Sequence, residues 1–247
     1  MNTTETLSQM NQLKLRGMTS AYQAQLELAM DQQLEAHEMV AQLVQSELLS
    51  RTNEKTLYYL KLAKLRIAAT PEQVKCSAAR NLTKQQLSVL LEGDYIRKGQ
   101  PLLISGPTGC GKSFLACALA HHACQTGYRT LYYNMTRFIE KITMAKLDGS
   151  YVRFLNHMER TPLIVLDDFG LQPLDQTIRL TLLQMLEDRY ARKSIIITSQ
   201  LPVNKWYEYI NDPTLADAIM DRITAKAYRI ELKGESLRKK EINTDKM

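Results

Sequence analysis

Hydrophobic residues recur at helical spacing through roughly the first 70 positions of the chain. One stripe comprises Met39, Val40, Leu43, Val44 and Leu48, and a second comprises Leu57, Leu60, Leu65 and Ala68. This region contains a single glycine, Gly17, and its first proline follows at Pro71. Pro71 and the polar run to Lys84 are typical of a linker. We therefore expect a helical N-terminal domain over residues 1–70 and a linker over residues 71–84.

Beyond the linker a short helix is expected at 84–91, and from residue 100 short apolar runs alternate with helical stretches. The runs predict strands at 101–105, 129–134, 163–167, 194–199 and 227–232. The stretches between and after them predict helices at 111–125, 136–147, 150–159, 176–191, 203–210 and 213–223. Strands that alternate with helices form parallel sheets covered on both faces. We therefore predict an α/β domain over residues 85–247.

The composition excludes several classes of protein. A chain of 247 residues with 45% hydrophobic and 23% charged residues is neither disordered nor low in complexity. The N-terminus has no cationic, apolar secretory signal, and no run approaches the roughly 18 apolar residues that span a bilayer. The four cysteines form no Cys-x-x-Cys pair and no disulfide scaffold. We expect a cytoplasmic protein with no membrane partner.

The net charge of +6 is distributed unevenly. Residues 1–50 carry two basic and six acidic side chains, whereas residues 51–84 carry eight basic and two acidic ones. Residues 85–221 are balanced, and residues 222–247 carry eight basic and four acidic side chains. A basic segment and a basic tail thus flank a neutral body. This suits a polyanionic partner such as nucleic acid, although a solvated helix face would explain either segment alone.

Residues 106–113, Gly-Pro-Thr-Gly-Cys-Gly-Lys-Ser, match the pattern G-x-x-x-x-G-K-[ST] in full, between a predicted strand and a predicted helix. The glycines let backbone N–H groups turn inward around a β-phosphate, and the helix N-terminus adds its dipole. Lys112 would reach the β- and γ-oxygens, and the Ser113 hydroxyl would ligate Mg²⁺. We predict an ATP and Mg²⁺ site formed by Gly106, Pro107, Thr108, Gly109, Cys110, Gly111, Lys112, Ser113 and Phe114.

Two later strands end in residues that suit the same site. The run 163–166 ends in Asp167, expected to hold Mg²⁺ through water opposite Ser113, and in Asp168, expected to polarise the attacking water. One strand separates this run from the phosphate loop, which favours the ATP-hydrolysing motor branch over nucleotide kinases. The run 195–197 ends in Thr198 and Ser199. If its strand lies between the other two, either hydroxyl can touch the γ-phosphate or the catalytic water, and we assign Ser199 to this role.

Together these segments resemble AAA+ ATPases of the helicase-loader and initiator branch. More narrowly, the chain resembles the IstB-type helper ATPases encoded beside the transposase in bacterial insertion sequences, which are relatives of DnaC-type loaders. The resemblance covers nearly the whole chain, and residues 197–202 and 234–239 are more specific than the phosphate loop. The segments that carry it are 13–18, 63–65, 106–113, 163–170, 197–202, 215–222 and 234–239.

The resemblance implies roles for further residues. Arg222 matches the arginine finger that completes a neighbouring subunit's site, so a homo-oligomer is expected. Arg238 matches the sensor-2 arginine, although it lies in a basic tail. The helices between the second and third strands match those that face the central DNA path. They carry Arg137, Lys141, Lys146 and Arg153, which could equally form a solvated face.

The basic segment supplies a second set of candidate DNA contacts. Its cations are interleaved with tyrosines, a mixture that suits backbone phosphates and base stacking, although the tyrosines could equally be interfacial core residues. The candidates are Arg51, Lys55, Tyr58, Lys61, Lys64 and Arg66.

The chain also departs from the wider AAA+ pattern. Asp168 replaces the usual glutamate, which leaves slow hydrolysis or dependence on a partner open. About 15 residues follow the last predicted strand, too few for the usual helical lid, so subunit packing is expected to use other surfaces.

The function expected from these features is an ATPase that oligomerises with ATP on duplex DNA, largely without sequence preference. It would prepare a target for a partner transposase, and hydrolysis would reset the complex. Three alternatives stay open at this point: a DnaC-like loader of a replicative helicase, a small-molecule P-loop kinase, and a nucleotide-gated adaptor with negligible turnover.

Overall fold

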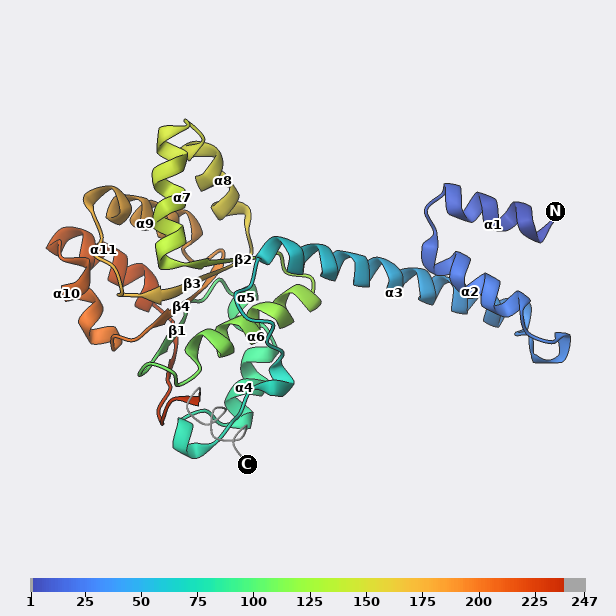
Figure 1. Ribbon diagram of the computed structural model, residues 1–247, viewed down its shortest axis with the longest axis horizontal. Coiled ribbons are helices and arrows are strands. Elements are labelled where there is room, and N and C mark those ends of the chain that lie inside the picture. Colours follow the sequence, from blue (N-terminus) through green and yellow to red (C-terminus); the bar gives the residue numbers. More distant parts are fainter. Residues whose placement is uncertain (1, 238–247) are drawn as a thin grey trace, which may run out of the picture. The chain divides into compact units, whose positions relative to one another are not determined.

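The computed structural model describes residues 2–237, and the chain divides into two compact units between Tyr58 and Tyr59. The first unit contains helices α1 (Thr3–Gln12) and α2 (Arg16–Leu26), a 3₁₀ helix (Met30–Gln32) and most of α3 (Ala36–Ala63), which continues into the second unit (Figure 1). The Asn2 side chain accepts a hydrogen bond from the Thr4 amide and so caps α1.

In the first unit, hydrogen bonds connect the N-terminus of α2 to a side chain of α3. The Glu47 carboxylate accepts hydrogen bonds from the amides of Gly17 (2.9 Å) and Met18 (3.2 Å), donors that a helix N-terminus leaves unpaired. Gly17 is required there, because an added Cβ would lie 2.3 Å from the Ser46 carbonyl oxygen. Arg51 Nε lies 2.7 Å from Glu47 Oε1 and is the largest cause of the lowered pKa of Glu47. Arg51, a candidate DNA contact, therefore pairs with a carboxylate.

The second unit is built on a five-stranded parallel sheet. The strands are β1 (Leu102–Ser105), β2 (Thr130–Asn134), β3 (Leu163–Phe169), β4 (Ser194–Ser199) and β5 (Tyr228–Glu231). Their spatial order is β2-β3-β4-β1-β5. β4 therefore lies between the carboxylate strand β3 and the loop strand β1, which is the condition set by the sequence for Thr198 and Ser199 to reach the nucleotide.

Helices cover both faces of this sheet, as Figure 1 shows. Along β3, Ile164 and Leu166 pack into one core with the helices between residues 135 and 224, while Leu163 and Val165 pack into a second core with the helices between residues 84 and 125. The predicted α/β fold is confirmed. The helices are α4 (Lys84–Leu91), α5 (Asp94–Arg97), α6 (Lys112–Gln125), α7 (Met135–Leu147), α8 (Tyr151–Arg160), α9 (Gln176–Arg189), α10 (Trp206–Ile210) and α11 (Pro213–Thr224).

Residues 71–84, expected as a linker, contribute to the core on the side of the sheet covered by α4 to α6. Two 3₁₀ helices, Pro71–Gln73 and Ala78–Arg80, lie in this segment, and the side chains of Val74 and Leu82 are buried. The apolar residues are too widely spaced among polar ones to show a helix or strand period. The segment packs as irregular structure and positions Arg80 beside the phosphate loop.

The buried side chain of Arg189 connects the end of α8 to the amino ends of two strands. The Arg189 guanidinium, 2% exposed, donates hydrogen bonds to the carbonyls of Met158 (2.5 Å) and Thr161 (2.7 Å), and also to those of Pro162 and Ser194. These carbonyls lie at the end of α8 and at the amino ends of β3 and β4. Arg189 thus holds the amino edge of the sheet together. Within residues 2–237, no helix combines the length and the apolar character needed to cross a membrane.

Candidate nucleotide-binding site

The phosphate loop connects β1 to α6 through three glycines with positive φ. The φ angles are +146° at Gly106, +82° at Gly109 and +91° at Gly111, a region that residues with a Cβ rarely adopt. Space excludes a side chain as well, since a Cβ at Gly106 would lie 2.3 Å from the Leu232 carbonyl oxygen. The loop is therefore a backbone cradle at the N-terminus of α6, where free amides and the helix dipole favour a bound anion.

Lys112 opens α6 and folds back over this cradle. Its Nζ donates hydrogen bonds to the carbonyl oxygens of Gly106 (2.8 Å) and Pro107 (2.9 Å), and the residue is buried. A second contact fixes the loop from the side, because Thr108 Oγ1 donates to Gln200 Oε1 at 2.7 Å. The ammonium thus lies in the loop where a triphosphate would meet it.

Asp167 is the centre of a buried hydrogen-bond network. Its Oδ1 accepts hydrogen bonds from Ser113 Oγ at 2.9 Å and from Thr198 Oγ1, and its Oδ2 accepts one from the Tyr132 hydroxyl at 2.6 Å. Burial, followed by the bond to Asp167, raises the pKa of Tyr132 and keeps the phenol a donor. The network holds a carboxylate and the Ser113 hydroxyl side by side, which are the hard oxygen ligands that Mg²⁺ prefers.

Asp168 leaves the regular strand and turns toward the same space. The pairing of β3 with β4 shifts register between Leu166 and Phe169, and Asp168 has a φ of +63°. Its Oδ2 accepts hydrogen bonds from Asn134 Nδ2 (2.8 Å) and from Arg66 Nη1 (3.3 Å). Burial, and then the charge of Asp167, raise the pKa of Asp168, while Arg66, Lys112 and Asn134 act in the opposite direction. A carboxylate with a raised pKa beside a phosphate cradle suits proton acceptance.

The two hydroxyls at the end of β4 have different partners. Thr198 Oγ1 donates to Asp167 and accepts a hydrogen bond from the Asp168 amide at 3.1 Å. Ser199 Oγ donates to the Phe169 carbonyl oxygen at 2.5 Å and accepts from the Leu201 amide at 3.0 Å. Thr198 therefore contacts the carboxylate pair, whereas Ser199 joins the ends of β3 and β4. We favour Thr198 over Ser199 as the hydroxyl nearest to the chemistry.

Several residues of this site carry no local sequence signal. Asn134 and Tyr132 lie on β2 and reach the carboxylates only because β2 pairs with β3. Arg80 Nη2 donates to the Cys110 carbonyl oxygen of the phosphate loop at 2.8 Å. Arg66, a candidate DNA contact, donates a hydrogen bond to Asp168. The polar residue that ends the second apolar run could have pointed to Asn134, but nothing local indicated Arg66 or Arg80.

The other candidate DNA contacts lie on exposed surface. Lys55, Tyr58, Lys61 and Lys64 lie on α3 or at its end, and Arg137, Lys141, Lys146 and Arg153 lie on α7 and α8. Lys146 Nζ also lies 4.8 Å from the centre of the Tyr151 ring, a cation–π contact. The candidates on α7 and α8 share one helical pair.

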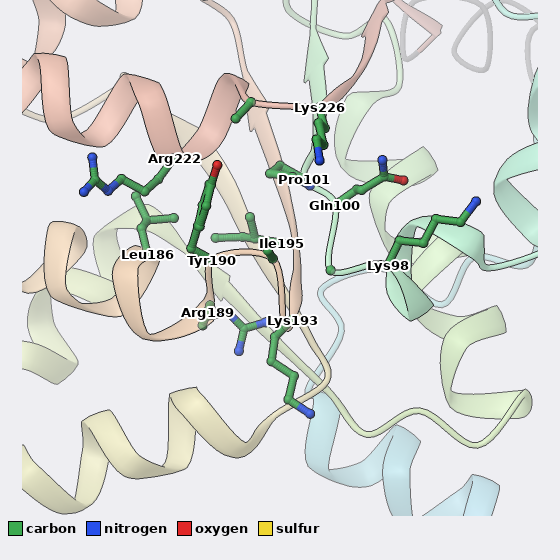
Figure 2. Close-up of a pocket in the computed structure, with 13 residues that line it drawn as sticks. Lys98, Gln100, Pro101, Leu186, Arg189, Tyr190, Lys193, Ile195, Arg222 and Lys226 are labelled. Carbon is green, nitrogen blue, oxygen red and sulfur yellow. The ribbon is translucent and has the colours of Figure 1, made fainter.

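Arg222 lies at the edge of the sheet opposite the phosphate loop. A hollow of ≈ 340 Å³ is lined there by Arg222, by Gln100 and Pro101 just before β1, and by Lys193 just before β4 (Figure 2). Since the strands are parallel, these residues mark the amino edge, whereas the phosphate loop follows the carboxyl end of β1. Arg222 Nη2 lies 3.1 Å from Glu187 Oε1. Arg238 lies outside the described residues.

The residues present fit ATP with Mg²⁺. The glycine-rich loop, whose space a Cβ would fill, supplies amide donors for the phosphates. Lys112 supplies a cation, and the Ser113–Asp167 pair supplies hard oxygen ligands for the metal. Together with the parallel sheet of order β2-β3-β4-β1-β5, they define a P-loop nucleotide-binding protein with the AAA+ fold. Residues 8–244 match the family described as IstB-like ATP binding protein, and the chain belongs to that family.

Curated relatives have similar names. The chain is 42% identical over 234 residues to an insertion sequence ATP-binding protein of Sinorhizobium fredii, which covers 95% of this chain and 96% of that protein. It is 28% identical to the ATP-binding protein of insertion sequence IS21 from Pseudomonas aeruginosa, over 94% of this chain and 88% of that protein. Both relatives are thus named as ATP-binding proteins of insertion sequences.

Solved structures show the same fold. The DnaC helicase loader superposes with a TM-score of 0.58 at 21% identity, covering 69% of this chain and 100% of that one. The replication initiator DnaA bound to AMPPCP and single-stranded DNA superposes with a TM-score of 0.59 at 20% identity, covering 74% of this chain and 55% of that one. At these identities the likeness concerns the AAA+ fold alone.

Proposed function

We propose that this protein is an ATP-hydrolysing, DNA-binding helper of transposition, which assembles on duplex DNA with ATP and prepares the target for the transposase of the same element. The observation that supports it most is the Ser113–Asp167–Asp168 arrangement against the phosphate loop, in a family of insertion sequence ATP-binding proteins. The family of insertion sequence ATP-binding proteins favours this function over a small-molecule kinase.

In the hydrolysis we propose, the loop amides and Lys112 bind the β- and γ-phosphates, and Ser113 and Asp167 hold Mg²⁺, which supplies charge neutralisation on the phosphate oxygens. Asp168 accepts the proton of the attacking water at a carboxylate oxygen, and Asn134 orients that carboxylate through its 2.8 Å hydrogen bond. Thr198 holds the Asp167 carboxylate and the Asp168 amide in place. Hydrolysis then ends the ATP-dependent assembly.

We assign Arg222 to a neighbouring subunit's nucleotide. It lies at the amino edge of the sheet, so it cannot serve the phosphate loop of its own chain at the carboxyl edge. An arginine contributed in trans stabilises the charge that develops on the γ-phosphoryl group. The active form is therefore an oligomer in which hydrolysis depends on assembly.

The DNA surface we propose excludes the two arginines that pair with carboxylates, Arg51 and Arg66. It comprises exposed cations whose binding to phosphates would be salt-dependent and weakly sequence-dependent. The candidates in the first unit are Lys55 and the exposed Tyr58, whose ring could stack on a base. Those in the second unit are Lys61 and Lys64 on or beside α3 and Arg137, Lys141, Lys146 and Arg153 on α7 and α8.

The proposal is tested by size-exclusion chromatography with light scattering, on the full chain with a non-hydrolysable ATP analogue, ADP or no nucleotide, each with and without duplex DNA. We expect the largest assembly with the analogue and DNA together. Lys112→Ala should elute and bind DNA in the same way with and without nucleotide. In a separate assay of phosphate release, Arg222→Ala should lose DNA-stimulated hydrolysis while it still binds nucleotide. Identical elution and DNA binding in all nucleotide states would refute the assembly function. Capture of a replicative helicase rather than the transposase would favour the loader alternative.

The DNA surface has its own test. Lys141→Glu with Lys146→Glu should weaken DNA binding and reduce the slope of log K against log salt, because phosphate contacts release counterions. Lys84→Glu, at an exposed cation of α4 that is not among the candidate DNA contacts, is the control for charge reversal at another surface position. A slope unchanged from the unmodified chain would remove α7 from the DNA surface.

A further inference from the structure

The guanidinium of Arg66 contacts both carboxylates that end β3. Its Nη1 donates a hydrogen bond to Asp168 Oδ2 at 3.3 Å and lies 4.0 Å from Asp167 Oδ2. The Asp167 side chain is completely buried and that of Asp168 is 18% exposed, whereas that of Arg66 is 50% exposed. The cation therefore reaches the carboxylate pair from solvent, on the segment that follows α3.

This contact opposes the role of Asp168 in hydrolysis. Oδ2 of Asp168 accepts hydrogen bonds from Arg66 and from Asn134. A cation paired with a carboxylate stabilises its charged form and makes it a weaker proton acceptor. An amide such as Asn134 can orient the carboxylate without adding a charge. Asp168 is thus a better base when Arg66 has moved elsewhere.

A γ-phosphate would offer Arg66 a second partner within the same site. Asp167, 4.0 Å from Arg66, is itself bonded to Ser113, the residue that follows Lys112 in the phosphate loop. A phosphate bound by Lys112 and Ser113 would therefore lie next to the carboxylates that Arg66 contacts. A guanidinium can bind phosphate oxygens through two parallel hydrogen bonds. A phosphate can therefore compete with Asp168, which Arg66 contacts through a single hydrogen bond.

We infer that Arg66 is a γ-phosphate-binding residue that acts within its own chain. Without a γ-phosphate it pairs with Asp168 and holds the base inactive. When ATP binds, the guanidinium transfers to the γ-phosphoryl oxygens and leaves Asp168 to Asn134 and the attacking water. After hydrolysis and phosphate release it returns to Asp168. The inference rests on the proposed ATP-binding function and adds a residue that distinguishes ATP from ADP.

The position of Arg66 in the chain gives this transfer a mechanical consequence. Only Lys64 and Leu65 separate it from Ala63, the last residue of α3, and Lys64 has a φ of +51°, so the helix ends in a left-handed turn. A change of partner by Arg66 would be transmitted to this turn. The backbone at residues 64–67 should therefore differ between the ATP-bound and ADP-bound protein.

The test measures the affinity of the full chain for a non-hydrolysable ATP analogue and for ADP, both with Mg²⁺, by calorimetric titration. Arg66→Ala should weaken analogue binding at least about tenfold, the effect of losing a charged hydrogen bond, and should leave ADP binding within about twofold. Arg66→Lys should recover part of the analogue affinity, because it keeps the charge but not the two-pronged geometry. Lys84→Ala is the control for removing one exposed cation.

A second measurement follows hydrogen exchange of the amides at residues 64–67. We expect a difference between the analogue and ADP states in the unmodified chain and none in Arg66→Ala. Circular dichroism melts of the unliganded variants check that they are folded. Equal weakening of both nucleotides, or unchanged analogue binding, would overturn the inference and leave Arg66 as a structural partner of Asp168. If the unmodified chain bound neither nucleotide, the proposed function itself would fail.

Discussion

Replacing Asp168 with Asn should make the unliganded chain more stable while abolishing hydrolysis. The substitution is nearly isosteric and removes one negative charge beside the buried Asp167. Asn tolerates the φ of +63° as well as Asp does, so the backbone need not move. Its side-chain oxygen can still accept the hydrogen bonds from Asn134 and Arg66.

Two opposing effects set the size of the stabilisation. Burial and the charge of Asp167 raise the pKa of Asp168, which means that the folded chain disfavours its charged form. Relief of such a charge contributes about 0.5–2 kcal/mol to stability. The lost ion pair with Arg66 costs up to about 1 kcal/mol, because the Arg66 side chain is 50% exposed. A net gain of about 1 kcal/mol corresponds to a rise of about 2–4 °C in melting temperature for a unit of this size.

The assay is thermal unfolding without nucleotide at several pH values, together with phosphate release from ATP. With the folded pKa of Asp168 above its unfolded value, the folded chain binds the proton more readily, so the unmodified chain gains stability as pH falls. The advantage of Asp168→Asn should be largest near neutral pH, should decline as pH falls through the folded pKa of Asp168, and should vanish below its lower, unfolded pKa. Hydrolysis should fall at least about a hundredfold with analogue binding retained.

Asp217→Asn, at an exposed position of α11, is the control for loss of an ordinary surface charge and should leave the melting temperature unchanged. If Asp168→Asn melted below the unmodified chain at neutral pH, the contacts of Asp168 with Arg66 and Asn134 would outweigh the repulsion from Asp167. A gain independent of pH would show that the charge of Asp168 is not its cause.

Three further substitutions probe the surroundings of the site. Tyr132→Phe removes the 2.6 Å donor to Asp167 and should cost about 1–3 kcal/mol in urea unfolding, with no loss if another donor replaces the phenol. Gly106→Ala places a Cβ 2.3 Å from the Leu232 carbonyl oxygen and should abolish nucleotide binding in a titration, whereas retained affinity would mean that the loop can relax. Arg189→Met leaves its buried carbonyl partners unpaired and should cost about 3 kcal/mol or more, measured in the same urea series.

The parts of the site that the sequence predicted are those with short-range signatures. The strand, the glycine-rich loop and the helix that begins at Lys112 are contiguous, so their pattern alone defines a phosphate cradle. Asp167 and Asp168 end a run of four apolar residues, which marks a buried strand. The strand order meets the condition placed on β4, but Thr198 contacts the carboxylates, whereas Ser199, the residue assigned from the sequence, contacts the Phe169 carbonyl oxygen.

The remainder depends on contacts between distant residues. Arg66 is 102 positions from Asp168, and a lysine- and arginine-rich segment has the same composition whether its cations meet DNA or a carboxylate. The first unit posed a different difficulty: α2 ends at Leu26 and α3 begins at Ala36, although no glycine or proline interrupts the sequence between them. Tertiary packing, such as the hydrogen bonds of Glu47 to α2, determines where these helices lie.

The placement of the phosphate loop and Arg222 at opposite edges of one sheet has a consequence for catalysis in assemblies. A contact that joins two unlike surfaces repeats head to tail, so an open row of subunits has a polarity. If Arg222 acts in trans as proposed, a nucleotide at one end would lack its arginine, and an arginine at the other end would face no nucleotide. An open row therefore contains one fewer complete site than subunits, whereas a closed ring loses none. Turnover per subunit should therefore rise with the length of the row. In a pair of subunits, turnover per subunit should be about half of that in a ring.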